Sequence, residues 1–424
     1  MGKKRKREAG LQALYGRVCG LDVHKKVIVA CVRILDSKDG TVQSTLKQFG
    51  TMTADLRGLC QWLVEFKVTH VAMESTGVYW QPVVNLLEGH FTTWLINAQH
   101  IKKVPGRKTD MKDAEWIAQL LQCGLLRPSF VPDRQQRELR DLTRQQSKLV
   151  QQRNAVQNRI EKVLETANIK LGSVASDVLG ASGRKMIEAL LQGEQDVTVL
   201  AELAQRKLRE KIPQLERALE GELTEHHRFL LCRLLDQYDF LEKEIAKVSD
   251  RLGAVAPPSF RAAVEQLDAI AGVGERGARA LLAETGTDMS RFPTHKHFTS
   301  WAGQCPGNHE SAGKRKSGKT PAANRHLDAV LTEMAHAAVR TKNSYFKSQY
   351  HRLAARRGKK RATGAVKHGL LVIVYDRLRD GRPYKDLGAD YFDKLNPQQR
   401  IRYHVKRLKE LGQEVELSPM PDAA

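Results

Sequence analysis

Residues 16–132 alternate between short apolar runs and amphipathic stretches, and this alternation constrains the fold more than any other feature of the sequence. The segment Arg17–Leu35 holds two runs rich in β-branched residues around a polar turn, which predicts an antiparallel hairpin with Asp22 where its first strand ends. Further strands are predicted over residues 68–75 and 91–98, and helices over residues 56–66, 77–89 and 109–124. Strands that alternate with helices predict an α/β domain, a layered sheet covered by helices.

At Arg134 the composition changes to Gln, Arg, Leu and Glu, without Gly or Pro until Gly172. Apolar residues there follow alternating three- and four-residue spacing, with polar Gln146 and Arg153 at two positions of the same seam. This spacing predicts a long, coiled-coil-like helix that packs on a partner helix or on another subunit, and an ordinary surface helix of a bundle is the alternative. Residues 215–252 could form its antiparallel return, and residues 171–183 indicate a turn-rich joint. The seam residues are Leu139, Leu142, Leu149, Val156, Ile160 and Val163.

A third region begins after the paired prolines Pro257 and Pro258. Its residues 267–286 contain a turn at Gly272 and Gly274 followed by an Ala-rich helix, a pattern typical of a helix-hairpin-helix. The N–H groups at the start of such a second helix can bind a DNA phosphate without reading sequence. A tight turn between two helices, without any ligand, explains the pattern as well.

The charge of the chain indicates a polyanionic partner. There are 70 Lys and Arg residues against 48 Asp and Glu, a formal net charge of +22. Such an excess most often marks a nucleic-acid-binding protein, and a merely soluble basic protein is the alternative. A block of basic residues over 356–361 is suited to contact a nucleic-acid backbone.

Cysteine usage and hydropathy indicate the cellular compartment in which the protein is expected. The six cysteines are scattered without a CxxC pair, which predicts reduced thiols and not a zinc site. The apolar runs are too short to span a bilayer, and the basic N-terminus lacks the apolar core of a signal peptide. We therefore expect a cytoplasmic, nucleoid-associated protein without membrane contact, whose residues 1–15 form a disordered basic tail.

Four carboxylates are the candidate site. Asp110 and Asp113 lie three residues apart at the start of a predicted helix, so they share one face about 5–6 Å apart. As a helix cap and a first-turn acid they would need no ligand. Asp22 and Glu74 each end a predicted strand, however, and four acids on neighbouring rims repel unless cations hold them. Carboxylates of this kind suit Mg²⁺ or Mn²⁺, and two such ions can support phosphodiester cleavage. Lys108, in the preceding basic turn, would hold nucleic acid near them.

The order of these acids resembles a known family. Asp22, Glu74 and then "KTDMKDA" with Asp110 and Asp113 are similar to the DEDD motif of insertion-sequence transposases with a RuvC-like (RNase H-like) N-terminal domain, the family that includes the Piv invertase. "ESTG" and "WAGQCPGNHESAGK" follow the family's order, and the resemblance covers most of residues 16–376. A proofreading exonuclease, the other common DEDD class, would show Asp-x-Glu on its first strand, where this chain has "DVHK".

The resemblance implies a serine nucleophile in the C-terminal domain that bonds covalently to DNA. Ser311 in "HES" is the matching position, and Ser317 is the alternative six residues on. Basic residues around them would grip phosphates. These are Lys314, Arg315, Lys316, Lys319 and Arg325.

The resemblance also implies partners, namely donor and target DNA, a structured guide (bridge) RNA, and further copies of the chain in a dimer or tetramer. The expected organisation is a catalytic domain over residues 16–133, a helical linker over 134–262, a mainly α-helical serine-bearing domain over 263–379, and an extension over 380–424 that lies beyond the resemblance. A hydrolytic RuvC-like nuclease or junction resolvase needs the four acids but no serine. A non-catalytic nucleic-acid-binding protein, whose acids are only caps, needs neither.

Overall fold

The fold is described from a computed structural model of the 424-residue chain. The structure describes residues 13–418 except residues 37–39, 76, 98–112 and 322. Most of the predicted basic tail, residues 1–12, therefore lies outside the described part. The chain divides into two compact units, residues 1–134 and 135–424, and each is described by itself.

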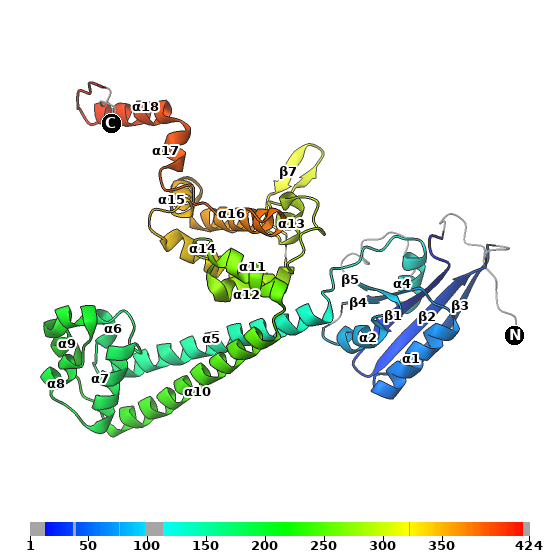
Figure 1. Ribbon diagram of the computed structural model, residues 1–424, viewed down its shortest axis with the longest axis horizontal. Helices are drawn as coiled ribbons and strands as arrows, with labels where there is room; N and C mark the ends of the chain where they lie inside the picture. Colours follow the sequence, from blue (N-terminus) through cyan, green and yellow to red (C-terminus); the bar gives the residue numbers. More distant parts are fainter. Residues whose placement is uncertain (1–12, 37–39, 76, 98–112, 322, 419–424) are drawn as a thin grey trace. The chain divides into compact units, whose positions relative to one another are not determined.

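The first unit is built on a mixed five-stranded sheet in the order β3-β2-β1-β4-β5 (Figure 1). Strands β1, β2 and β3 pair antiparallel, whereas β4 and β5 run parallel to β1. The predicted hairpin over residues 17–35 is confirmed as β1 and β2, and an α/β arrangement is confirmed for this unit. The strands are β1 (Arg17–Val23), β2 (Val27–Leu35), β3 (Val42–Gly50), β4 (His70–Glu74) and β5 (Thr92–Ile96).

Strand β3 is absent from the strands predicted from the sequence. It lies at the edge of the sheet, and most of its side chains are exposed or half-buried, including Gln43, Ser44 and Lys47. An edge strand of this kind has few apolar residues to mark it. Its pairing with β2 is nonetheless continuous from Leu35 to Val27.

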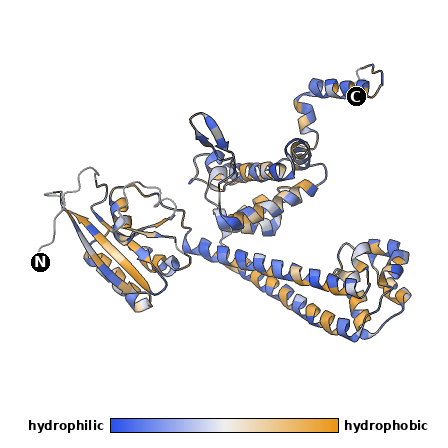
Figure 2. Cartoon of the chain, turned by 180° about the vertical axis from the view of Figure 1, so that it is seen from behind, coloured by the Kyte–Doolittle hydropathy of each residue, from blue (hydrophilic) through white to orange (hydrophobic). Residues whose placement is uncertain are grey.

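Helices cover both faces of the sheet. Helices α1 (Thr53–Glu65) and α2 (Trp80–Leu87) pack on one face, against Leu21 and Met73. Helix α4 (Asp113–Gln122) packs on the other face, against Val18 and Ala72. Successive strand residues point to opposite faces, so β1 and β4 each contribute to both cores. Figure 2 shows apolar residues concentrated on the central strands.

In the second unit, two long helices lie side by side and antiparallel, α5 (Arg134–Thr166) and α10 (Glu225–Val255) (Figure 1). The seam predicted on α5 packs on this partner helix of the same chain, where Leu149, Val156 and Ile160 share a core with residues of α10. The polar seam position Arg153 donates from Nη1 to Glu242 Oε1 on α10 at 2.7 Å.

Short helices close the far end of this pair. The predicted turn-rich joint holds α6 and the start of α7, and the stretch expected to be one helix over 215–252 is interrupted before Thr224, which caps α10. Apolar residues of these helices join the core of α5 and α10. They are α6 (Leu171–Val174), α7 (Ala181–Gln192), α8 (Val197–Glu202), η1 (Arg206–Lys211) and α9 (Ile212–Leu219).

The remaining helices build a further core around Phe298, Phe346 and Leu370, all fully buried. A two-stranded hairpin, β6 (His309–Ser311) and β7 (Lys314–Ser317), projects from it, and α17 and α18 form the extension. The helices are α11 (Pro258–Asp268), α12 (Gly274–Thr285), α13 (His295–Trp301), α14 (Arg325–Arg340), α15 (Tyr345–Arg357), α16 (Lys359–Asp380), α17 (Tyr391–Leu395) and α18 (Pro397–Glu410).

Within the described residues, every helix falls short of the length and apolarity needed to cross a membrane. All six cysteines are free thiols, as predicted. Burial raises the pKa of the Cys31 thiol to about 12, with the negative charge of Glu115 as a lesser cause. Cys31 is therefore a protonated core residue at neutral pH.

Candidate active site

Asp22 and Glu74 occupy matching positions on neighbouring strands. In the parallel pair β1 and β4, Gly20 lies opposite Ala72 and Leu21 lies opposite Met73. The next step of this register places Asp22 beside Glu74, at the carboxyl ends of both strands. Neighbouring strands lie about 4.8 Å apart, so two carboxylates meet on one face of the sheet.

Helix α4 brings Asp113 to the same face. A Cβ atom on Gly20 would lie 2.3 Å from the carbonyl oxygen of Ala114 and 2.5 Å from the backbone nitrogen of Ala118, so helix and strand are in backbone contact. Asp22 is two residues after Gly20 and lies on the same face of β1. Asp113 directly precedes Ala114 as the first residue of α4. The fold thus brings three of the four predicted acids to one end of one face.

The surroundings of these acids allow access from solvent. The Asp22 side chain is 26% exposed, Glu74 is half-buried and Asp113 is exposed. His24 Nε2 lies 3.1 Å from Asp22 Oδ2. His24 is a site residue that was not predicted, although it follows Asp22 by two residues in "DVHK".

The donor set suits a hard divalent cation, because carboxylate oxygens are the ligands that Mg²⁺ and Mn²⁺ prefer. Among the residues that the structure describes, no three His, Cys, Asp or Glu side chains are already close enough together to hold a metal ion. Asp110 and Lys108 lie in residues 98–112, outside the described part. The described acids therefore lie on one rim of the sheet, accessible to solvent.

Ser311, the predicted nucleophile, is the last residue of β6, next to the turn of the β6–β7 hairpin. Both residues of the connecting turn, Ala312 and Gly313, have positive φ, at 50° and 70°. This combination is the one that a two-residue type I′ turn requires. Asn, Asp or Gly normally stands at the first position of such a turn, so Ala312 gave no signal of a hairpin in the sequence. Ser317, the alternative, ends β7 on the other side of the hairpin.

The hairpin presents its cations beside Ser311. Lys314 pairs directly with Ser311 across the turn, and an irregularity in the pairing follows opposite Glu310. Ser311, Lys314, Lys316 and Lys319 are exposed, and the hairpin is hydrophilic along its length (Figure 2). Arg315 belongs to β7, and Arg325 is the exposed first residue of α14.

The base of the hairpin is fixed by buried polar contacts. Gln304, 8% exposed, donates from Nε2 to Asp328 Oδ1 at 2.9 Å, and Lys367 Nζ donates to the same oxygen at 2.6 Å. Burial opposes ionisation of Asp328, yet the bonds from Lys367 and Gln304 outweigh it and lower the pKa of this carboxyl. Asp328 is therefore a carboxylate at neutral pH, and it links α14 to the chain that enters the hairpin.

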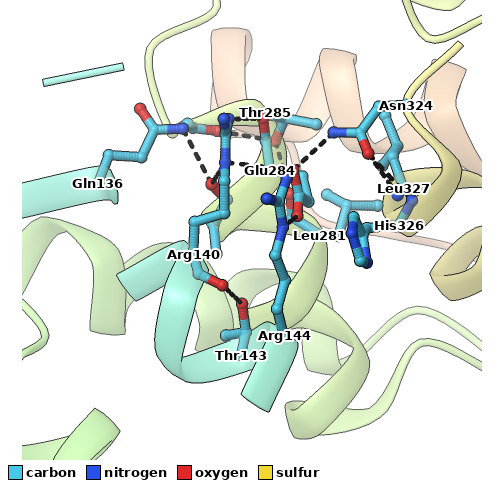
Figure 3. Close-up of polar contacts among 12 residues, drawn as sticks. Gln136, Arg140, Thr143, Arg144, Leu281, Glu284, Thr285, Asn324, His326 and Leu327 are labelled. Atoms are coloured by element: carbon cyan, nitrogen blue, oxygen red, sulfur yellow. Dashed lines mark hydrogen bonds and ion pairs between the residues drawn. The ribbon is translucent and has the colours of Figure 1, made fainter. Parts of the chain in front are cut away.

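A buried carboxylate fixes the chain that leaves the hairpin. Glu284, only 2% exposed, accepts hydrogen bonds from Arg144 of α5 and from Asn324, whose side chain also caps α14 (Figure 3). Arg140 Nε lies 3.2 Å from Glu284 Oε2, and Arg140 Nη2 donates to the carbonyl oxygen of Glu284 at 2.8 Å. This cluster could not be predicted from the sequence, because an acid within an Ala-rich helix carries no local signal of its burial.

The two glycines of the predicted helix-hairpin-helix lie between packed helices α11 and α12. Gly272 has φ of 84°, and a Cβ there would lie 2.2 Å from the backbone nitrogen of Ala338, so the turn packs tightly on α14. Gly274, with φ of 62°, is exposed and starts α12. Gly272 is thus required by packing, whereas Gly274 leaves the start of α12 open.

Sequence comparisons place the chain among transposases. A transposase family of the DEDD, IS110 type matches residues 19–169, which include all four acids. A second match, described as the transposase IS116/IS110/IS902 family, covers residues 264–351, which include Ser311 and both glycines. A probable family 20 transposase of Pseudomonas aeruginosa is 30% identical over 274 residues, 64% of this chain and 71% of that relative. The resemblance found in the sequence is thereby confirmed, and the chain belongs to the IS110 family of DEDD transposases, enzymes that act on DNA.

Proposed function

We propose that this transposase cleaves and rejoins DNA strands through Ser311, with Asp22, Glu74, Asp110 and Asp113 as ligands of two divalent cations. The observation that carries the proposal is the register of β1 and β4 with the start of α4, which gathers three acids on one rim. If Asp110 and Asp113 only capped their helix, the two further carboxylates Asp22 and Glu74 at neighbouring strand ends would not be required. A RuvC-like (RNase H-like) domain accounts for the mixed sheet and the acids together.

DEDD transposases generally use divalent metal ions, and Mg²⁺ or Mn²⁺ is the choice that fits all-carboxylate ligands. Two such ions, when bound, stabilise the attacking and leaving oxygens of a phosphodiester displacement. The half-buried Glu74 and the partly exposed Asp22 would hold them at the rim of the sheet, open to a phosphate from solvent.

Ser311 has the position that a nucleophile toward DNA needs. It is exposed at the tip of a hairpin whose base is fixed by Gln304 and Asp328, and Lys314 pairs with it directly. In the proposed step the serine oxygen bonds to phosphorus, the hydroxyl proton leaves to solvent, and the bond from phosphorus to one deoxyribose oxygen breaks. The released strand end takes up a proton as a free hydroxyl. Attack by the hydroxyl of another strand end reverses the step and restores Ser311.

Lys108, Lys314, Arg315, Lys316, Lys319 and Arg325, with the start of α12 at Gly272 and Gly274, would bind the DNA backbone. Contacts of this kind position DNA without reading its sequence. Base pairing by a structured guide RNA would then select donor and target sites, as in other RNA-guided proteins. A dimer or tetramer would supply the two strand ends that exchange. Exposed Phe229 and Phe240, eleven residues apart on the outer side of α10, offer an apolar contact for a second copy.

The test is a covalent adduct between protein and DNA. Reactions of the wild type with end-labelled DNA in Mg²⁺, run on denaturing gels, should show a protein-linked band that Ser311→Ala and Asp113→Ala both abolish. If the band persists in Ser311→Ala and vanishes in Ser317→Ala, the nucleophile is Ser317. If cleavage continues in both serine variants without any adduct, the hydrolytic resolvase is correct. The non-catalytic alternative is correct if Mg²⁺ never produces cleavage.

A further inference from the structure

A pocket outside the serine hairpin and the acids lies between helices α15 and α16 and the strap of residues 382–387 that follows α16. Its volume is about 450 Å³, within the usual range of about 300–1,000 Å³ for small-ligand sites. The strap belongs to the C-terminal extension, beyond residue 351, where the family match ends. The match covers the α15 side of the pocket, whereas α16 and the strap lie beyond it.

Apolar and aromatic side chains form its walls. Phe346 is fully buried, and Tyr345, Val372 and Ile373 are half-buried around it. Gly369 lets α16 approach Phe346 closely, because a Cβ there would lie 3.1 Å from the ring of Phe346. Flat aromatic walls of this kind suit a planar ring system.

Two polar atoms at the pocket are buried without a hydrogen-bond partner among the residues that the structure describes. One is the acceptor Gln349 Oε1, and the other is the donor Arg377 Nε. The oxygen of Gln349 lies 3.9 Å from the position that a Cβ on Gly369, another residue of the lining, would take. Buried polar atoms of a native protein almost always have partners. A ligand whose edge carries both a donor and an acceptor would satisfy both.

The strap is held in place without a ligand. Asp386 Oδ1 accepts from the backbone nitrogens of Tyr345 at 2.9 Å and Gly388 at 2.7 Å, and Asp386 Oδ2 accepts from the Tyr384 hydroxyl at 2.8 Å. At the other end, Arg377 Nη1 donates to the carbonyl oxygen of Arg382 at 2.8 Å. The pocket is thus preformed, which reduces the entropy that a ligand would otherwise lose on ordering it.

The rim of the pocket is cationic. Arg382 and Lys385 line it and are exposed, so their charges lie where a phosphate attached to a bound group would reach solvent. Arg382 also lies 3.6 Å from Asp380, and Asp376 is the acid of the lining. His368, also in the lining, has its pKa lowered by burial and by the nearby His295. A neutral imidazole offers one further donor and one further acceptor.

We infer that this pocket binds a single unpaired nucleobase of a nucleic acid, with its ring among the aromatic walls and its flanking phosphate at Arg382 and Lys385. A nucleobase combines a flat ring, an edge with donors and acceptors, and an attached anion. Unstacked bases of loops and bulges are commonly bound in this way. The inference depends on the chain acting on nucleic acid and not on the serine chemistry.

The experiment compares duplexes of equal length that do or do not carry one unpaired nucleotide. The full chain is titrated by fluorescence polarisation with bulged and perfect duplexes, in one arm of RNA and one of DNA, in EDTA so that cleavage does not contribute. We expect the wild type to prefer a bulged duplex by about tenfold in at least one arm, and that arm identifies the nucleic acid. Gln349→Leu and the filling variant Ala365→Leu should abolish the preference while affinity for the perfect duplex stays within twofold.

Gln237→Leu on α10 and Ala355→Leu on α15 are matched controls, because both residues are exposed and lie outside the pocket. Both should keep the preference, and unchanged circular dichroism should show that the pocket variants fold. The inference is overturned if the wild type shows no preference in either arm, or if Ala365→Leu retains it. It is overturned equally if Ala365→Leu changes only the mass measured by light scattering, since a second copy of the chain would then occupy the pocket.

Discussion

Arg144 donates two hydrogen bonds to the buried carboxylate of Glu284, from Nε to Oε1 at 2.7 Å and from Nη2 to Oε2 at 2.9 Å (Figure 3). Asn324 donates to Oε2 of the same carboxylate, at 2.6 Å. One buried charge therefore joins α5, α12 and the chain that returns from the serine hairpin.

Glu284→Ala should lower the free energy of unfolding by about 3–5 kcal/mol, because it leaves two partly buried arginines without their carboxylate. Glu242→Ala is the matched control. It breaks the bond to Arg153 on the same long helix, but the Glu242 side chain is 43% exposed, so its loss should cost at most about 1 kcal/mol. Urea unfolding followed by circular dichroism measures both. Equal losses would mean that Glu284 contributes no more than a surface acid.

Gly20→Ala should destabilise the first unit by about 1–3 kcal/mol, since its methyl group would overlap the backbone of α4. Gly58→Ala is the control on α1, where a Cβ would meet nothing within 4 Å and alanine should stabilise the helix by up to about 1 kcal/mol. Thermal melting should therefore shift in opposite directions for the two variants. A shift in the same direction would contradict the contact between β1 and α4.

Alanine at Asp22, Glu74, Asp110 or Asp113 should reduce strand exchange by at least about a hundredfold, because ligands of a shared pair of ions act as a unit. DNA binding in EDTA should be retained, and chelation should inactivate the wild type to the same level. Glu88→Gln, an exposed acid just after α2, serves as the control and should keep full activity. Normal recombination by Glu74→Ala in Mg²⁺ would exclude the four-acid site.

The long helices allow stability and assembly to be separated. Glutamate at Leu142 and Leu149 should destabilise the chain, since Leu149 is buried in the shared core of α5 and α10 and Leu142 packs against the neighbouring core. Glutamate at Phe229 and Phe240, 61% and 59% exposed, should leave melting unchanged and lower the mass of the particle. Light scattering and thermal melting on both double variants test this. An unchanged mass for the phenylalanine variant would place the subunit contact elsewhere.

The pair of Asp328 with Lys367 predicts a dependence of stability on pH. The pKa of Asp328 is lower in the folded chain than in the unfolded one, so its contribution is present above the unfolded value of about 3.9 and disappears as pH falls through the folded value. Asp328→Asn should melt below the wild type at pH 7, and the difference should shrink as the pH is lowered below about 4. A difference that stays constant between pH 7 and pH 3 would show that the charge contributes nothing.

The sequence pattern was sufficient for the elements whose apolar residues repeat regularly. The hairpin of β1 and β2 and the two parallel strands have buried side chains that mark them, and the seam on α5 packs on a partner helix, one of the alternatives that its spacing predicted. The DEDD order identified the family because four spaced acids and a separate C-terminal motif occur together. Local patterns of this kind can be recognised in the sequence without knowledge of how the elements pack.

Contacts between distant residues could not be predicted in the same way. Strand β3 is stabilised by its pairing with β2 and exposes most of its side chains, and the serine hairpin depends on a left-handed alanine at position 312. Glu284 is bonded to Arg140 and Arg144, which lie 144 and 140 residues before it in the sequence. The burial of such groups becomes visible only when the helices are packed.

The contact of Gly20 with Ala114 and Ala118 has a consequence for how this enzyme can vary. Strand β1 carries Asp22 and helix α4 begins with Asp113, and at Gly20 main-chain atoms of α4 limit how closely the two elements approach. Substitutions in the surrounding core can change rotamers and volumes without altering that spacing. Divergent copies of the gene can therefore exchange most apolar residues of the first unit, while a single added methyl group at this crossing would move one acid away from the others.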